Sequence, residues 1–293
     1  MCFPIPPSFI IMKLFIVGSV KINSWWRKRL FINNLDSLET IQELFHWNFN
    51  IVGKYGGFCA KEIIKRYKKA VITNDDESSY YNVIKKQISS VGGNDPKSLL
   101  FFFMEDHWFV CPHKNLFFYL LEKFYNSRAD VLRITHLTEL WERESTYKVI
   151  TDKPLYKEYF IDLNMLKNLW QNYPGAYITS LPVILKKEFA LQLLENNKSL
   201  LNSKKPGGFE LYGKKAEEFL AKRSFITMVP TFHVLREVFW VNQDERAMDA
   251  SKALKIIALR DASDSVIKSW RRFVRLLMAP RVLAGRVKRI FRL

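Results

Sequence analysis

Three consecutive side chains that can bind a divalent metal ion, Glu105, Asp106 and His107, follow directly on the apolar residues 99–104 in "LLFFFMEDHWFV". A buried strand that ends at acidic groups delivers them to the edge of a sheet, where ligands commonly bind. A Mg²⁺ or Mn²⁺ ion held there by one or two carboxylates would neutralise the charge of a diphosphate. Asp106 is the preferred ligand, with Glu105 or His107 assisting. The alternative is a strand end whose charged residues face water.

A second acidic turn, with Asp75 and Asp76, occurs in "VITNDDES". If residues 70–76 form another strand, both acidic segments lie at the same edge of the sheet. Carboxylates in that position accept hydrogen bonds from a ribose in dinucleotide-binding folds. The alternative is a helix-capping turn that leads into residues 79–91.

A glycine-rich loop, "KPGGFELYG", contains Glu210 directly after Gly207, Gly208 and Phe209. The two glycines would let the backbone pass close to a ligand. A loop glutamate there could act as a general base that removes the proton of an attacking hydroxyl. Alternatively, Glu210 only starts a helix over 210–223, where its charge favours the helix dipole.

A late histidine, His233, lies in "VPTFHVLREV" together with Arg236. A neutral imidazole could complete a metal site, and the arginine could hold a phosphate. The alternative for His233 is a purely structural role.

The elements that must position these residues alternate along the first 130 residues. Apolar runs predict strands over 13–20, 49–55, 70–76 and 99–105, and amphipathic stretches predict helices over 35–47, 60–69, 79–91 and 115–127. This alternation predicts an α/β fold with a mainly parallel central sheet. Its loops at the strand ends would carry the chemistry.

After Asp130 the spacing of the predicted elements changes. It predicts strands over 129–137 and 146–151, a helix over 163–173, and a strand that leads into a helix within 175–197. We expect an N-terminal extension (1–12), one domain (13–262, with halves 13–130 and 131–262) and a separate tail (263–293).

The composition favours a folded protein with an anionic partner. The chain has 293 residues, of which 48% are hydrophobic, and a formal charge of +17. Nine of the basic residues and no acidic residue lie in 265–293, which leaves +8 for the rest of the chain. That distribution fits an anionic substrate better than a nucleic-acid surface spread over the whole molecule.

The cysteines and the N-terminus favour a reducing cytoplasm. Cys2, Cys59 and Cys111 show neither a disulfide framework nor zinc spacing. The apolar opening segment is interrupted by prolines and by Lys13, which makes it a poor signal peptide or membrane span. We expect Met12 to be the natural start.

The basic tail, residues 265–293, places Trp270, Phe273 and Leu277 at helical spacing beside arginines, and Pro280 divides it into two short helices. A basic amphipathic segment with aromatic residues is suited to the headgroup zone of an anionic membrane. The alternative is a solvated helix packed on the domain or on a partner.

In this order, the motifs "MEDHW", "YITSLPVILKKEFA", "PGGFE" and "FHVLREV" resemble glycosyltransferases of the Rossmann-like A-type fold. The resemblance covers about residues 13–240. More narrowly, the chain resembles bacterial enzymes that synthesise surface polysaccharides, lipopolysaccharide or capsule. The chain differs from the family at the metal motif, which in the family is usually Asp-any-Asp, and at the end of the first strand.

The resemblance implies a metal-assisted, inverting transfer of a sugar from a nucleotide-diphosphate donor, most simply a UDP-sugar. It implies Mn²⁺ or Mg²⁺ held by Asp106, His107 and His233, with Glu210 as the base. The expected donor-binding residues are Asp75, Asp76, Glu105, Asp106 and Arg236. The acceptor would be a polysaccharide or a lipid-linked glycan, reached from the cytoplasmic face of the cell membrane.

Two other readings of the sequence remain open. The basic tail and the aromatic residues could bind nucleic acid, although the acidic strand ends would repel phosphates unless a metal intervened. The chain could also be a non-catalytic relative that keeps the fold and serves as a scaffold.

Overall fold

The computed structural model describes residues 13–93, 95–96, 98–105, 107–109, 111, 114–134, 148–172, 178–179, 182–197, 213–231 and 234–237. The chain divides into two compact units, Met1–Trp240 and Val241–Leu293, and all described residues belong to the first. The predicted extension (1–12), the domain boundary at 262 and the tail therefore lie outside the described residues.

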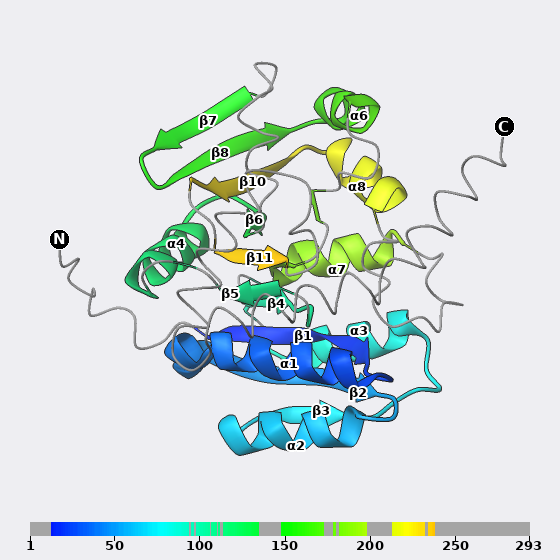
Figure 1. Ribbon diagram of the computed structural model, residues 1–293. Coiled ribbons are helices and arrows are strands. Elements are labelled where there is room, and N and C mark those ends of the chain that lie inside the picture. The colour runs from blue at the N-terminus through cyan, green and yellow to red at the C-terminus, as the bar shows by residue number, and fades with distance from the viewer. Residues whose placement is uncertain are drawn as a thin grey trace, which may run out of the picture. The chain divides into compact units, whose positions relative to one another are not determined.

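Nine strands form one sheet in the order β3-β2-β1-β4-β9-β6-β10-β8-β7 (Figure 1). Their bounds are β1 Leu14–Lys21, β2 Phe45–Val52, β3 Val71–Thr73, β4 Leu99–Phe102, β6 Val131–Arg133, β7 Lys148–Lys153, β8 Tyr156–Ile161, β9 Val183–Lys186 and β10 Phe225–Pro230. Two further strands, β5 (His107–Phe109) and β11 (Leu235–Glu237), pair with each other.

The sheet is parallel in one half and mixed in the other. Strands β3, β2, β1 and β4 run parallel to one another. Strand β9 is antiparallel to both β4 and β6, and β8 is antiparallel to both β10 and β7. The prediction of an α/β fold is thus confirmed, but the mainly parallel pairing holds only in part. Strands β6 and β10 are also parallel, whereas the four pairings that involve β9 and β8 are antiparallel. Short apolar strands such as β9 carry no signal of their direction.

Helices cover both faces of the sheet. The bounds are α1 Trp25–Ser37, α2 Gly56–Arg66, α3 Tyr80–Ser90, α4 Lys114–Asn126, α6 Leu163–Asn172, α7 Lys187–Glu195 and α8 Gly213–Ala221. In Figure 1, α1 lies in front of β1 and α3 behind it. Among the described residues, no helix is both long and apolar enough to cross a membrane.

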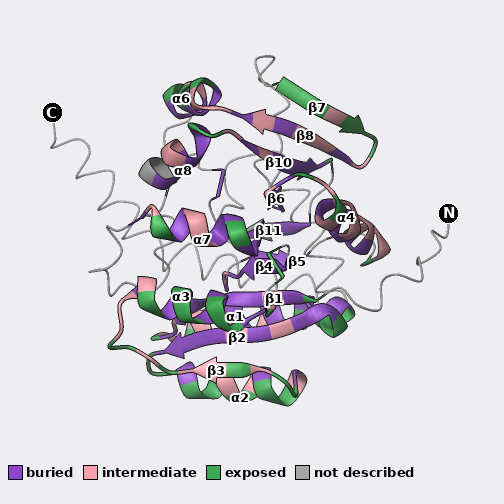
Figure 2. Cartoon of the chain, turned by 180° about the vertical axis from the view of Figure 1, so that it is seen from behind, coloured by how far each residue is buried: buried purple, intermediate pink, exposed green. Residues whose placement is uncertain are grey.

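Side chains alternate between the two faces of β1, as the pleat of a strand requires. Leu14 and Ile16 belong to a core shared with α1, α2 and α4, whereas Val17 belongs to a second core shared with α3, α6, α7 and α8. In Figure 2, β1 and β2 are largely buried and the helices expose one side. A sheet covered on both faces can expose polar groups only at its strand ends, which is where a site must lie.

The predicted helix over 35–47 is wrong. Helix α1 ends at Ser37, a 3₁₀ helix runs over Glu39–Leu44, and β2 starts at Phe45. Leu38, Ile41 and Leu44 are all buried. Their spacing of three residues fits the period of a 3₁₀ helix, which resembles an α-helical stripe over so short a stretch. The predicted helices over 79–91, 115–127 and 163–173 are confirmed as α3, α4 and α6.

Candidate functional site

The order of the first four strands creates a crevice at their carboxyl ends. The chain leaves β1 for β2 and β3 on one side and then returns to β4 on the other side. In open α/β sheets, ligands bind at such a switch point, outside the carboxyl ends of the strands. The register pairs Lys21 of β1 with Val52 of β2, and Val17 with Phe102 of β4. The segments after β1 and β4 therefore both begin at this edge.

The acidic segment after β4 is joined here to the segment after β1. The Arg27 Nε atom donates a hydrogen bond to Glu105 Oε1 at 2.7 Å, and a second guanidinium nitrogen pairs with the same oxygen. The Glu105 side chain is only 7% exposed. Arg27 lies in the first turn of α1, directly after β1. This ion pair bridges the switch point, and Arg27 was not among the predicted site residues.

Two further contacts attach the same acidic segment to α1. The Asn34 side-chain amide donates to the backbone carbonyl of Met104 at 2.7 Å, and the Phe109 backbone N–H donates to Ser37 Oγ at 3.0 Å. The loop that carries the predicted metal motif is therefore held from both ends by one helix.

The pairing of β5 with β11 brings the late segment next to the acidic one. His107 lies opposite Glu237, and Trp108 lies opposite Arg236. His107 is buried, with 6% of its surface exposed. Two predicted residues that are far apart in the sequence, His107 and Arg236, thus lie on neighbouring strands.

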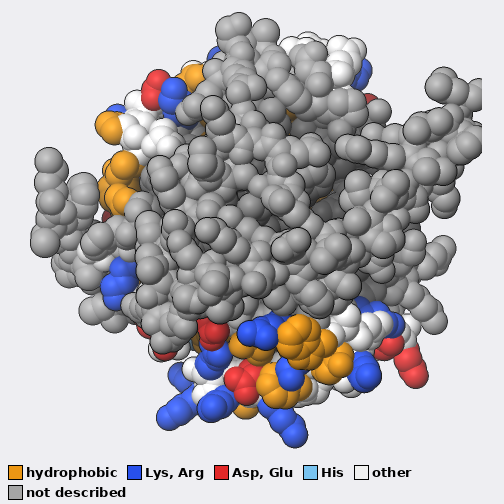
Figure 3. Space-filling model, in the orientation of Figure 1, with side chains coloured by type: hydrophobic (Ala, Val, Ile, Leu, Met, Phe, Trp, Pro, Cys, Tyr) orange, Lys and Arg blue, Asp and Glu red, His pale blue; other side chains and the backbone are white. Residues whose placement is uncertain are grey.

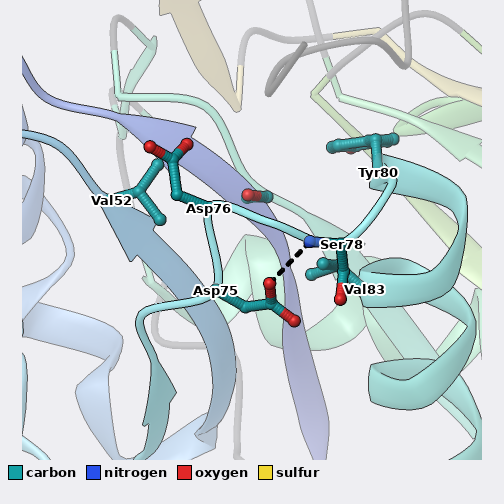
Figure 4. Close-up of a pocket in the computed structure, with 7 residues that line it drawn as sticks. Val52, Asp75, Asp76, Ser78, Tyr80 and Val83 are labelled. Carbon is teal, nitrogen blue, oxygen red and sulfur yellow. Dashed lines mark hydrogen bonds between the residues drawn. The ribbon is translucent and has the colours of Figure 1, made fainter. Parts of the chain in front are cut away.

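A shallow, solvent-open hollow lies at the carboxyl ends of β1 and β2 (Figure 4). Polar groups from three segments meet there. The residues that line it are Ser19, Val52, Asp75, Asp76, Ser78, Tyr80 and Val83. Both predicted carboxylates of the second acidic turn therefore lie at this hollow.

Asp75 shapes the turn at the hollow. Its Oδ1 atom accepts hydrogen bonds from the backbone N–H groups of Ser78 at 2.8 Å and Glu77 at 3.2 Å, and Figure 4 shows the carboxylate pointing toward Ser78. Hydrogen bonds from Ser78 lower the pKa of Asp75, because they stabilise its charged form. Asp75 thus closes a turn before α3, whereas the helix itself is capped by Ser79 and not by an aspartate of this turn.

Asn50 holds that turn in place from β2. Its amide nitrogen donates to Ser19 Oγ at 2.9 Å and to the carbonyl of Asp75 at 2.8 Å. Its carbonyl oxygen accepts from Thr73 Oγ1 at 2.9 Å and from the Asp75 backbone N–H at 2.8 Å. Asn50 is 1% exposed, and it was not among the predicted site residues.

Asp76 pairs with the last residue of β1. Both of its carboxylate oxygens lie 3.1 Å from Lys21 Nζ. The side chains are 38% and 52% exposed for Lys21 and Asp76, so the pair lies at the rim of the hollow. A carboxylate held by one exposed lysine keeps lone pairs for a ligand's hydroxyl groups.

The remaining predicted residues fall outside the described part of the chain. Asp106, Glu210 and His233 are not described, and of Arg236 only the backbone is described. Within the described residues, no group of three or more His, Cys, Asp or Glu side chains could hold a metal ion. In the predicted metal motif, the structure describes the side chains on either side of Asp106, which are those of Glu105 and His107.

Comparison with known proteins finds likenesses in structure only. No family model and no curated protein matches the chain. It is similar to the crystal structure of residues 1–349 of TarS from S. aureus, with 13% identity and a TM-score of 0.45, over 87% of this chain and 68% of that one. The structure of the same protein with UDP gives 12% identity and a TM-score of 0.44, over 88% and 68%. At this distance the likeness assigns no activity.

Proposed function

We propose that this protein is a nucleotide-sugar-dependent glycosyltransferase whose donor binds at the carboxyl ends of β1–β4. The observation that carries the proposal is the convergence at the switch point of two acidic segments with the Arg27–Glu105 pair. A nucleoside diphosphate needs acceptors for its ribose hydroxyl groups at one end and positive charge at the other. This edge supplies the acceptors, and a metal ion bound there would supply the charge.

The hollow is the proposed nucleoside site. Asp76 and Ser78 line it and can accept hydrogen bonds from a ribose, while Asn50 and Asp75 hold their loop in shape. UDP is the nucleotide to test first, since the TarS structure contains it.

The diphosphate would lie nearer the segment after β4. Because Arg27 already pairs with Glu105, we assign the metal to Asp106, His107 and His233 and keep Glu105 as a donor-binding residue positioned by Arg27. Carboxylate and imidazole ligands suit Mn²⁺, and carboxylates suit Mg²⁺. The ion would neutralise the departing diphosphate. Arg236 is the proposed phosphate contact from the neighbouring strand.

Glu210 is the proposed general base of an inverting transfer. It would remove the proton of the acceptor hydroxyl as that oxygen attacks the anomeric carbon. The acceptor we propose is a polysaccharide or a lipid-linked glycan of a bacterial surface. The protein would reach it from the cytoplasmic face, with the basic tail (265–293) on the membrane.

The first experiment is a thermal-shift titration with UDP, GDP, CDP and their sugars, with and without Mn²⁺. Ligand binding to the folded state raises the melting temperature. We expect one nucleotide to give a metal-dependent rise that Asp106→Ala removes. Asp152→Ala is the matched control, because Asp152 lies on β7, at the opposite edge of the sheet from β3.

Turnover distinguishes an enzyme from a scaffold. We expect Glu210→Ala to reduce sugar transfer far more than it reduces the nucleotide-dependent thermal shift. A protein that shows no shift with any nucleotide would contradict the proposed donor site. Binding without transfer or donor hydrolysis would favour the scaffold.

A further inference from the structure

Aromatic and cationic side chains gather where α1 and α2 begin. We call this surface the α1–α2 patch. Trp25 is 48% exposed and Phe58 is 45% exposed, which is unusual for such large apolar side chains. In Figure 3, hydrophobic side chains lie among Lys and Arg side chains over the region of α1 and α2. The patch consists of Trp25, Lys28, Arg29, Lys54, Tyr55 and Phe58.

The rings and cations of the patch contact one another. Lys28 Nζ lies 3.5 Å from the centre of the Phe58 ring and 5.8 Å from that of Tyr55. The Arg29 guanidinium carbon lies 5.2 Å from the Trp25 ring, and Lys54 Nζ lies 5.5 Å from the Tyr55 ring. These cation–π contacts hold the polar heads of the cations beside exposed ring faces. Apolar ring surface and positive charge therefore lie side by side within the patch.

The helix dipoles reinforce the charge of the patch. Neither α1 nor α2 has an acidic residue in its first turn, so the positive end of each helix dipole adds to the three cations. The patch therefore favours an anionic partner.

We propose that the α1–α2 patch is a docking surface for an anionic lipid bilayer. Tryptophan, tyrosine and phenylalanine rings settle in the headgroup region, and lysine and arginine side chains reach the lipid phosphates. The patch presents both kinds of side chain at the starts of helices, where the backbone is already ordered. Little conformational entropy is therefore lost on binding. A soluble polyanion would use the cations but would not need half-exposed rings from two separate helices.

One segment of the patch follows the candidate donor site in the sequence. Val52 lines the hollow, and Lys54 and Tyr55 follow it by two and three residues. The docking itself does not depend on the proposed function, since it rests on surface residues that take no part in the donor site.

The test measures binding of the full chain to sedimented vesicles of phosphatidylcholine alone or mixed with phosphatidylglycerol. We expect binding only to the anionic vesicles. Trp25→Ala/Phe58→Ala should weaken it at least tenfold, and Lys28→Ala/Arg29→Ala/Lys54→Ala should weaken it by roughly fivefold for each charge removed. These side chains are on the surface, so both variants should melt like the wild type.

The matched control is Val149→Ala/Ile150→Ala. These two side chains of β7 are 44% and 47% exposed and lie outside the patch, so their removal should leave vesicle binding unchanged. Three outcomes would overturn the proposal: no binding of the wild type to anionic vesicles, equal binding by the ring variant, or a loss in the control as large as in the patch variants. If heparin displaced the wild type and the ring variant from the vesicles equally well, the patch would be a general polyanion site. That result would also overturn the proposal.

Discussion

Arg27 and Glu105 are separated by 78 residues in the sequence, yet their side chains pair across the carboxyl ends of β1 and β4. Glu105 is nearly buried, and this guanidinium pairs with its carboxylate. Both the stability of the fold and the shape of the candidate donor site therefore depend on the pair.

Replacement of Arg27 by methionine should leave the Glu105 charge without this partner. We expect the free energy of unfolding to fall by about 1–3 kcal/mol, somewhat less than for a fully buried pair because Arg27 is partly exposed. Urea unfolding measures this loss. Arg66→Met is the control, because its pair with Asp36 is more exposed and should contribute less than about 1 kcal/mol. Equal losses in the two variants would show that the Arg27 pair has no special role.

Asn50→Ala should destabilise the protein and loosen the hollow. The substitution removes four hydrogen bonds and leaves buried partners at Ser19 and in the Asp75 turn, which should cost about 2–4 kcal/mol. It should also reduce the nucleotide-dependent rise in melting temperature. Asn48→Ala, on the same strand, loses a more exposed contact with Ser90 and should cost less than about 1 kcal/mol. A nucleotide response that survives intact in Asn50→Ala would separate this turn from the donor site.

A buried carboxyl group should make the stability depend on pH. Glu217 is fully buried and accepts hydrogen bonds of 2.5 Å from the backbone N–H and the hydroxyl of Thr179. Burial raises the pKa of Glu217 from 4.5 to about 7, because it disfavours the charged form more than Arg133 and Thr179 favour it. Between these two values the folded state holds a proton that the unfolded state has lost.

The free energy of unfolding should therefore fall as the pH rises from about 4.5 to about 7. Glu217→Gln should flatten this fall, since the amide cannot ionise. Burial also raises the pKa of Asp130, so some slope of the same sign should remain in the variant. Urea unfolding across this pH range measures both slopes. An unchanged slope in Glu217→Gln would assign the pH dependence to other groups.

Gly18→Ala should strain the middle of β1. Gly18 has a φ of +151°, and a Cβ atom there would lie 2.6 Å from the Phe49 ring. We expect a loss of about 1–3 kcal/mol, partly recovered in combination with Phe49→Leu. Gly57→Ala should have the opposite sign and stabilise α2 by about 0.5–1 kcal/mol, because nothing lies within 4 Å of its Cβ position. Thermal unfolding of the variants is the measurement.

The sequence predicted secondary structure best where apolar residues recurred at a regular spacing along one continuous segment. The apolar stripes over 79–91 and 115–127 predicted α3 and α4, and the acidic groups after two apolar runs predicted a site at the strand ends. Local patterns could not predict strand direction beyond β4 or the partners of the acidic groups. Arg27 and Asn50 act on residues 78 and 25 positions away, so their roles exist only after the sheet has formed.

The pairing of β5 with β11 has a consequence for the synthesis of the chain. Strands β1 to β4 and the acidic segment have been translated by residue 109, but the partner of β5 is not complete until residue 237. More than a hundred residues must therefore be translated before His107 and Trp108 acquire their neighbouring strand. A nascent chain can assemble the first half of the sheet early, yet the proposed catalytic edge stays incomplete until translation has passed Glu237.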